Sequence, residues 1–117
     1  MHLPDSTGAL MSQDEEWCEV GVNGSRRRIR FHDYAAIYDI AGLYEHLFYE
    51  KLECSSPQTV TALLADELDR SGTDPESLVA LDLGAGNGMV GEQLRGIGVQ
   101  SVVGVDLLPE AAAAAER

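Results

Sequence analysis

Basic residues are scarce in this sequence, which has 8 Lys and Arg against 20 Asp and Glu and a formal net charge of −12. Affinity for a phosphate backbone comes from Lys and Arg contacts that release counterions, so this balance argues against a nucleic-acid partner. Half of the basic residues form one cluster, Arg26, Arg27, Arg28 and Arg30. The cluster is compatible with an arm for nucleic acid or an anionic substrate, but we interpret it as a solvated segment leading into the first helix.

Cysteines and long apolar runs are also few. The two cysteines, Cys18 and Cys54, form no C-x-x-C pair and have no clustered histidines, so the sequence predicts neither a metal site nor a disulfide framework. The first ten residues lack the basic and apolar regions of a signal peptide. No stretch approaches the roughly 18 apolar residues that a membrane span requires. We therefore expect a cytoplasmic protein with no membrane partner.

The chain of 117 residues is long enough for one small domain. Residues 1–24 mix proline, glycine, serine and acids without a sustained period. We interpret them as a mobile leader with a short strand around residues 19–22. Residues 25–117 are then expected to form the folded domain.

Two helices are predicted in the first half of that domain. The first follows Asp33, a suitable N-cap, and its apolar and aromatic residues recur at spacings of three and four as far as Phe48, with Gly42 as a weak point. The second begins with Ser56 as N-cap and ends at Gly72. Its predicted apolar face consists of Val60, Leu63, Leu64 and Leu68.

The pattern changes in the last third of the chain. Residues 78–83 (LVALDL) and 101–106 (SVVGVD) are short, nearly continuous apolar runs, as expected of strands buried on both faces. A glycine-rich turn and a short helix separate them, and five successive alanines after the second run favour another helix. Strand, helix, strand and helix in this order predict an α/β fold with parallel strands joined by a right-handed crossover.

The turn LGAGNGMVG contains two overlapping glycine signatures. Gly84, Gly86 and Gly88 form G-x-G-x-G, whereas Gly86, Gly88 and Gly91 form the G-x-G-x-x-G fingerprint of dinucleotide-binding proteins. In both readings the glycines let a ligand approach the backbone, and the following helix start offers N–H groups to an anion. The turn alone therefore does not discriminate between cofactors.

Two acids beside the turn do discriminate in part. In the dinucleotide reading Asp82 lies inside an apolar strand, whereas in the G-x-G-x-G reading it lies at the strand's carboxyl end, where ligands of open α/β sheets bind. There it could face the ammonium of S-adenosylmethionine, or cap local backbone. Asp106 follows the second strand and could accept two hydrogen bonds from a ribose diol, which NAD also carries. Its alternative role is an N-cap or turn residue before Pro109.

The stretches LVALDLGAGNGMVGEQL and VVGVDLLPEAAAAAER resemble motif I and the following motif of class I S-adenosylmethionine-dependent methyltransferases. The resemblance covers residues 78–117. It implies a Rossmann-like sheet, of which the chain carries the leading helices and the first two parallel strands, with residues 25–117 as the N-terminal part of the cofactor-binding domain. It also implies transfer of a methyl group to a small-molecule or protein acceptor. The acceptor and the catalytic residues are not specified by the sequence.

The residues that the resemblance assigns to S-adenosylmethionine lie in the glycine turn and at the two strand ends. They are Asp82, Gly84, Ala85, Gly86, Asn87, Gly88, Asp106 and Leu107. The backbone of residues 84–86 would line the methionine moiety, and Asp82 would face its amino group. Asn87 and Gly88 would complete the turn. Asp106 would hold the ribose hydroxyls, and Leu107 would pack against adenine.

Some alternatives stay open at this point. Tyr34 and Tyr38 could cover the cofactor, although a core role is favoured for both. The sequence ends within a predicted helix, from which we expect a truncated product or a fragment. Two parallel strands with open edges are expected to be marginally stable alone or to pair with another chain, for instance as a homodimer. The competing functions are an NAD(P)-dependent oxidoreductase, and an inactive truncated chain that acts only as an association module.

Overall fold

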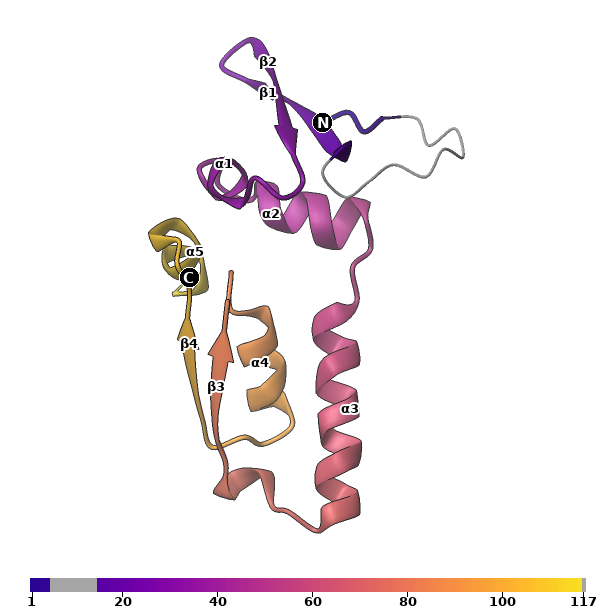
Figure 1. The fold of residues 1–117 in the computed structure, drawn as a ribbon, viewed down its shortest axis with the longest axis vertical. Helices are drawn as coiled ribbons and strands as arrows, with labels where there is room; N and C mark the ends of the chain where they lie inside the picture. Colours follow the sequence, from indigo (N-terminus) through magenta and orange to yellow (C-terminus); the bar gives the residue numbers. More distant parts are fainter. Residues whose placement is uncertain (5–14, 117) are drawn as a thin grey trace. The chain divides into compact units, whose positions relative to one another are not determined.

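The computed structural model describes residues 1–4 and 15–116 (Figure 1). Residues 5–14, which belong to the predicted leader, and the final residue lie outside the described part. The chain forms two compact units, residues 1–44 and 45–117, and each is described by itself. The expected boundary near residue 24 falls within a tight turn of the first unit, between two paired strands.

A β-hairpin dominates the first unit, with strand β1 at Trp17–Val22 and strand β2 at Ser25–Arg30. The strands pair in antiparallel register through a two-residue turn, Asn23-Gly24, in which both residues have positive φ. This is the backbone that asparagine and glycine favour in hairpins. From the sequence we predicted only a short strand near residues 19–22, so the second strand was missed.

The arginine cluster lies on β2, and all four of its side chains are exposed, as expected of a solvated segment. Arg28 donates a hydrogen bond to Glu19 at 3.0 Å, and its guanidinium lies 3.9 Å from the centre of the Trp17 ring. Arg27 pairs with Asp39 at 3.8 Å. Because these pairs are exposed, each contributes at most about 1 kcal/mol to stability. The cluster is thus a solvated segment before the first helix, as predicted, and its backbone forms a strand.

The predicted first helix is divided into three short pieces. Helix α1 spans Tyr34–Tyr38 and is capped by Asp33, whose Oδ1 accepts a hydrogen bond from the Ala36 amide at 3.3 Å. The chain then turns at Gly42, where φ is +77°, before helix α2 at Leu43–Glu45 and the π-helical segment η2 at His46–Lys51. The N-cap was predicted correctly, whereas the break at Gly42 is stronger than the predicted weak point.

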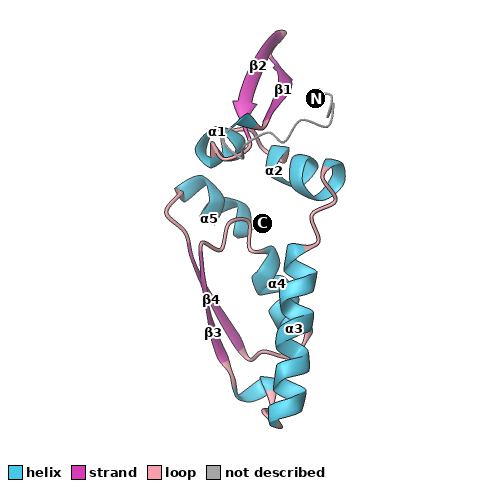
Figure 2. Cartoon of the chain, turned by 45° about the vertical axis from the view of Figure 1, so that its right-hand side comes forward, coloured by secondary structure: helices cyan, strands magenta, loops and turns pink. Residues whose placement is uncertain are grey.

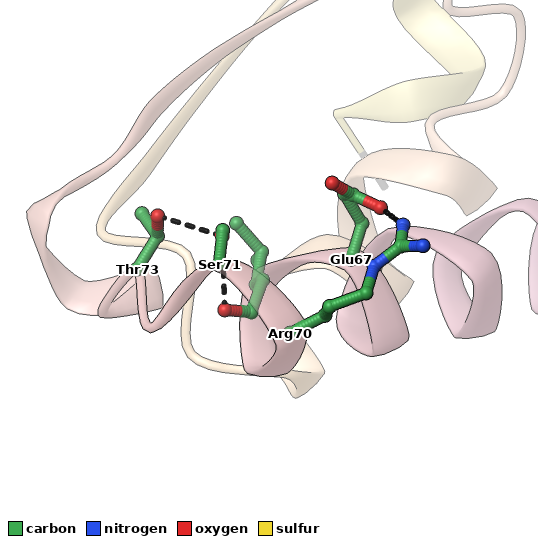
Figure 3. Close-up of polar contacts among 5 residues, drawn as sticks. Glu67, Arg70, Ser71 and Thr73 are labelled. Atoms are coloured by element: carbon green, nitrogen blue, oxygen red, sulfur yellow. Dashed lines mark hydrogen bonds and ion pairs between the residues drawn. The ribbon is translucent and has the colours of Figure 1, made fainter.

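Helix α3 spans Ser56–Ser71, and its N-cap is Ser55 rather than the predicted Ser56. It ends as predicted at Gly72, which is left-handed, and the Thr73 amide donates back to the Leu68 carbonyl at 2.9 Å. These two features form a Schellman cap. Figure 3 shows the surrounding contacts: the Ser71 hydroxyl bonds to the Leu68 carbonyl and to the Thr73 hydroxyl, and Arg70 pairs with Glu67.

The buried side of α3 differs in part from the prediction. Pro57, Thr61 and Leu68 are buried. Val60 and Leu63, which were predicted to face the core, are 54% and 66% exposed. The buried residues and the predicted apolar residues both recur at helical spacing, so periodicity alone could not show which side of α3 packs against another part of the chain. The assignment of Val60 and Leu63 to the core was therefore wrong.

The rest of the second unit alternates strands and helices. Its elements are a short 3₁₀ turn η3 at Pro75–Ser77, β3 at Val79–Leu83, α4 at Met89–Gly96, β4 at Ser101–Val105 and α5 at Pro109–Ala115. Strands β3 and β4 pair in parallel, with Asp82 opposite Gly104 and Leu83 opposite Val105. The chain is thus a mixed α/β protein with a two-stranded parallel sheet, as the element order predicts.

Among the described residues of the second unit, helices cover only one face of this sheet. Helices α4 and α3 lie on the same side of the two strands (Figure 2), and α4 packs so closely that an added Cβ on Gly91 would lie 3.4 Å from Val102. The alternate residues point the other way, and Leu81 and Leu83 are 62% and 75% exposed. Val79, Val103 and Val105 share this exposed face. The expectation of strands buried on both faces was therefore wrong.

Candidate functional site

The glycine turn, residues 84–88, connects the carboxyl end of β3 to the first residue of α4. Its start is bonded to the end of β4, because the amides of Gly84 and Ala85 donate to the Val105 carbonyl at 2.8 and 3.1 Å. Gly84, Gly86 and Gly88 have φ of +72°, +56° and +81°, a region that other residues adopt only with strain. All three glycines of the G-x-G-x-G pattern therefore serve the backbone path of the turn.

A fourth glycine, Gly104 on β4, allows the turn to lie against the sheet. A Cβ added to Gly104 would lie 2.9 Å from the Cβ of Ala85, closer than carbon atoms in contact can approach. Ala85 thus packs against β4 at Gly104, the residue that pairs with Asp82 in the sheet. From the sequence, Ala85 was predicted to line the cofactor, and no role was predicted for Gly104. The structure adds a packing role for this pair.

Asp106 lies directly after β4 and binds the glycine turn. Its Oδ2 accepts a hydrogen bond from the Gly86 amide at 2.8 Å, and its Oδ1 accepts one from the Leu108 amide at 2.9 Å. The second bond lies at the N-terminus of α5, where Leu108 has no side chain that could cap. A carboxylate has about four lone-pair sites, so each oxygen retains capacity for one more donor. The turn role that we considered for Asp106 is therefore real, and it leaves room for a bound hydroxyl.

Asp82 lies at the penultimate position of β3, on the sheet face that carries α4. Its side chain is half-buried, and no hydrogen-bond donor among the described residues reaches its buried Oδ2. A carboxylate oxygen removed from water without a partner is costly, by several kcal/mol for a fully buried charge. A local capping role for Asp82 would give this oxygen a backbone donor, and the described part of the chain provides none.

Asn87 is the fourth residue of the turn, and both ends of its amide are bonded. Its Oδ1 accepts a hydrogen bond from the Tyr49 hydroxyl at 3.2 Å, and its Nδ2 donates to Glu45 Oε1 at 3.0 Å. Neither partner was predicted from the sequence, because they lie 38 and 42 positions before Asn87 along the chain, and such distant partners leave no local signal. The i, i+4 spacing of Glu45 and Tyr49 could have placed them on one helical face, but not against the turn.

A pocket of about 300 Å³ lies at the carboxyl end of the two strands. Its lining residues are Leu83, Gly84, Val105, Asp106 and Leu107. The lining is mainly aliphatic, with the Asp106 carboxylate as its charged group, and Leu107 is 98% exposed. A small apolar pocket with one well-placed polar group is typical of sites for organic ligands, and this volume is at the lower end of their range.

The predicted site residues are therefore only partly brought together. Gly84, Asp106 and Leu107 line the pocket, and Gly86 is bonded to Asp106. Asp82 lies on the other face of its strand and does not line the pocket. Gly88 is close to α5, because an added Cβ would lie 3.1 Å from the Cβ of Ala115.

Tyr34 and Tyr38 belong to the unit of residues 1–44. The Tyr38 ring stacks on that of Tyr44 with 4.7 Å between the ring centres, and the Tyr34 hydroxyl lies 3.2 Å from His32 Nδ1. Their role as a cofactor cover stays a prediction.

The two cysteines differ in environment. Burial raises the pKa of the Cys18 thiol, which lies in the hairpin core. Hydrogen bonds from the Ser56 side chain, and then from its backbone, lower the pKa of the Cys54 thiol below its ordinary value. The Cys54 sulfur lies 3.3 Å from the Ser56 hydroxyl at the start of α3. Because the thiolate is the reactive form, Cys54 should be the more reactive thiol at neutral pH.

We expect iodoacetamide to alkylate Cys54 well before Cys18, and Ser56→Ala to shift the pH midpoint of Cys54 alkylation upward. Losing the donor disfavours the thiolate, so the rate below that midpoint falls. Mass spectrometry of alkylation against pH measures both effects. Ser55→Ala is the matched control, since the Ser55 side chain makes no cap hydrogen bond. An unshifted midpoint in Ser56→Ala contradicts the assignment.

Other classes of site find little support in the described ranges 1–4 and 15–116. Within them, no three His, Cys, Asp or Glu side chains are grouped so that they could hold a metal ion. No helix there combines the length and apolar character needed to cross a membrane. Comparisons with protein-family models, with curated proteins and with solved structures found no match to this chain.

Proposed function

We propose that residues 45–117 form a Rossmann-like S-adenosylmethionine-binding unit of a methyltransferase. The observation that carries the proposal is the buried Oδ2 of Asp82, which no described donor reaches although it lies next to the glycine turn. A cationic ligand would satisfy this oxygen, and the ammonium of S-adenosylmethionine is such a group. The nicotinamide cofactors carry no amine of this kind near the turn.

The element bounds support the same glycine register. Strand β3 ends at Leu83, and helix α4 begins at Met89, so the turn spans the G-x-G-x-G residues. The dinucleotide reading needs a strand that continues to about Ala85. Gly91 lies within α4 against Val102, where a glycine permits close packing of helix on strand. Close packing is also the role of the third glycine in the dinucleotide fingerprint, so Gly91 does not distinguish between the two glycine registers.

The pocket at the strand ends suits the adenosine half of the cofactor. The free lone pairs of Asp106 could accept a ribose hydroxyl while the same carboxylate keeps its bonds to Gly86 and Leu108. Leu107, which is 98% exposed, offers an aliphatic surface to adenine. The methionine carboxylate would face the N-terminus of α4, where Gly88 provides no side-chain cap.

The chemistry follows from this cofactor. Its sulfonium activates the methyl group, so the protein chiefly has to bind and orient the cofactor and keep it near the acceptor. In this proposal Asp82 holds the amino group of the cofactor. The glycine turn lines the rest of the methionine moiety, and Asp106 holds the ribose of the adenosine. The acceptor is a small molecule or a protein. We place the reaction in the cytoplasm, in keeping with two free thiols.

We expect calorimetry to show binding of S-adenosylhomocysteine and none of NADH. Asp106→Ala should weaken S-adenosylhomocysteine binding at least tenfold, because the bond to the ribose hydroxyl is lost together with the bonds that hold the Gly86 and Leu108 amides. The matched control is Asp74→Ala, which removes a carboxylate that also accepts a backbone amide, that of Glu76 at 2.9 Å, in another turn. Equal affinity in the wild type and Asp106→Ala contradicts the ribose assignment. Binding of NADH alone would reverse the choice of cofactor.

The exposed aliphatic face of the sheet supports a second candidate, a non-enzymatic association module. Its residues include Leu81 and Leu83, which are 62% and 75% exposed. Apolar patches of this kind mark interaction surfaces in many proteins. Self-association without a response to either cofactor would favour this candidate. Binding of S-adenosylhomocysteine to a monomer would exclude it.

A further inference from the structure

The glycine turn is bonded to the segment that precedes α3 through the side chain of Asn87. Tyr49, in η2, donates from its hydroxyl to Asn87 Oδ1 at 3.2 Å. Glu45, the last residue of α2, accepts from Asn87 Nδ2 at 3.0 Å. All three side chains are half-buried, and all three residues belong to the unit of residues 45–117. We call these three residues the Asn87 clamp.

The polarity of the clamp is fixed by the chemistry of its members. A carboxylate can only accept hydrogen bonds, so Glu45 must face the amino end of the Asn87 amide. The carbonyl end then faces Tyr49, whose hydroxyl donates. Asparagine supplies a donor and an acceptor at the required positions, whereas aspartate at position 87 would place two carboxylates against each other.

The turn needs such an anchor. Gly86 and Gly88, on either side of Asn87, have positive φ, and glycine has more conformational freedom to lose on ordering than any other residue. The Gly86 amide is held by Asp106, and the Gly88 amide donates to the Ala85 carbonyl at 2.9 Å. Asn87 is the one residue of the stretch 86–88 with a side chain, and that side chain bonds to Tyr49 and Glu45 instead of to either strand.

We propose that Glu45 and Tyr49 are positioning residues, which hold the glycine turn in its ligand-binding form through Asn87. Asn87 then acts on the cofactor indirectly, through the backbone of Gly86 and Gly88, instead of contacting it. Its effect on affinity rests on the proposed function, whereas its effect on the order of the turn does not. The π-helical form of η2 agrees with this role, because π-helical turns occur frequently at functional sites.

The test uses the chain of 117 residues; one substitution removes the hydrogen bond between positions 45 and 87, and a second restores it with the opposite direction. Asn87→Asp opposes Glu45 with a second carboxylate, and Glu45→Gln in the same chain restores a donor between the two positions. We expect Asn87→Asp to increase the amide-hydrogen exchange rate of Gly88 about tenfold, as for the loss of one hydrogen bond to a charged group, and the double variant to return it to near the wild-type rate. Binding of S-adenosylhomocysteine should weaken and recover in parallel.

The control is Asn23→Asp, which makes the same chemical change in the turn of the hairpin. It should leave Gly88 exchange and S-adenosylhomocysteine affinity unchanged. Wild-type Gly88 exchange in Asn87→Asp, or no recovery in the double variant, overturns the clamp. Faster exchange with unchanged affinity overturns its positioning role. If the wild type itself does not bind S-adenosylhomocysteine, the proposed function fails, and the exchange rates alone decide on the clamp.

Discussion

Asp82→Asn should abolish most of the affinity for S-adenosylmethionine and at the same time stabilise the chain without ligand. The carboxylate has a buried oxygen that no donor in the described residues reaches, so it costs free energy until a cation binds. Replacing it with a neutral amide lowers that cost, because an unpaired buried amide is less costly than an unpaired buried charge, and we expect about 1 kcal/mol of added stability. In the proposed site the charge-assisted hydrogen bond to the ligand ammonium would be lost, which corresponds to about 1.5–3 kcal/mol of binding free energy.

The opposite signs of the two effects make this prediction specific. Urea unfolding measures the stability, and calorimetry with S-adenosylhomocysteine, which carries the same amino group, measures the binding. Asp66→Asn is the control, because it makes the same change of charge at an exposed position of α3. We expect it to change both quantities little. A destabilised Asp82→Asn would show that the carboxylate has a structural partner, and retained affinity would remove Asp82 from the site.

Local signals predicted the backbone of the second unit well. The apolar runs at residues 78–83 and 101–106 became β3 and β4, and the left-handed cap at Gly72 was predicted from its residue type. These features depend on short-range preferences, which a single sequence carries. The missed strand β2 had such a signal too, since Asn23-Gly24 between two runs is a strong hairpin indication. The arginines on β2 obscured it, because they break the expected apolar alternation.

The burial of these elements was predicted less well, for a physical reason. Apolar periodicity shows which residues share a face, but it does not show whether another element covers that face. Leu81 and Val60 follow the patterns of a buried strand and a buried helix face, yet they are 62% and 54% exposed. Burial depends on contacts with other parts of the chain or with partners, and such contacts leave no local pattern.

The candidate site shows the same division. The turn glycines and Asp106 were found from spacing, because their roles are set within one strand–turn–helix unit. The bonds of Asn87 to Tyr49 and Glu45 connect segments about forty residues apart, and no property of position 87 alone indicates them. Gly104 is a similar case, since its requirement for glycine comes from Ala85 in a preceding turn.

This last contact leads to the second large expected effect. Gly104→Ala should destabilise the chain by about 1–3 kcal/mol, the usual cost of overpacking, and should weaken cofactor binding by displacing the glycine turn. The added methyl group would lie 2.9 Å from the Cβ of Ala85, so one of the two backbones must move. Ala85→Gly in the same chain removes the opposing methyl group and should recover most of the loss. Urea unfolding and S-adenosylhomocysteine calorimetry measure the two effects.

A matched variant separates the clash from the general effect of replacing glycine. Gly96→Ala, at the end of α4, adds its methyl group where no described atom outside its own stretch of helix lies within 4 Å. Because alanine is the better helix former by about 0.5–1 kcal/mol, this change should stabilise the chain or leave it unchanged. Stability of Gly104→Ala equal to the wild type would show that Ala85 moves without cost, and the turn would then not depend on Gly104. Loss of stability without recovery in the double variant would place the clash elsewhere than at Ala85.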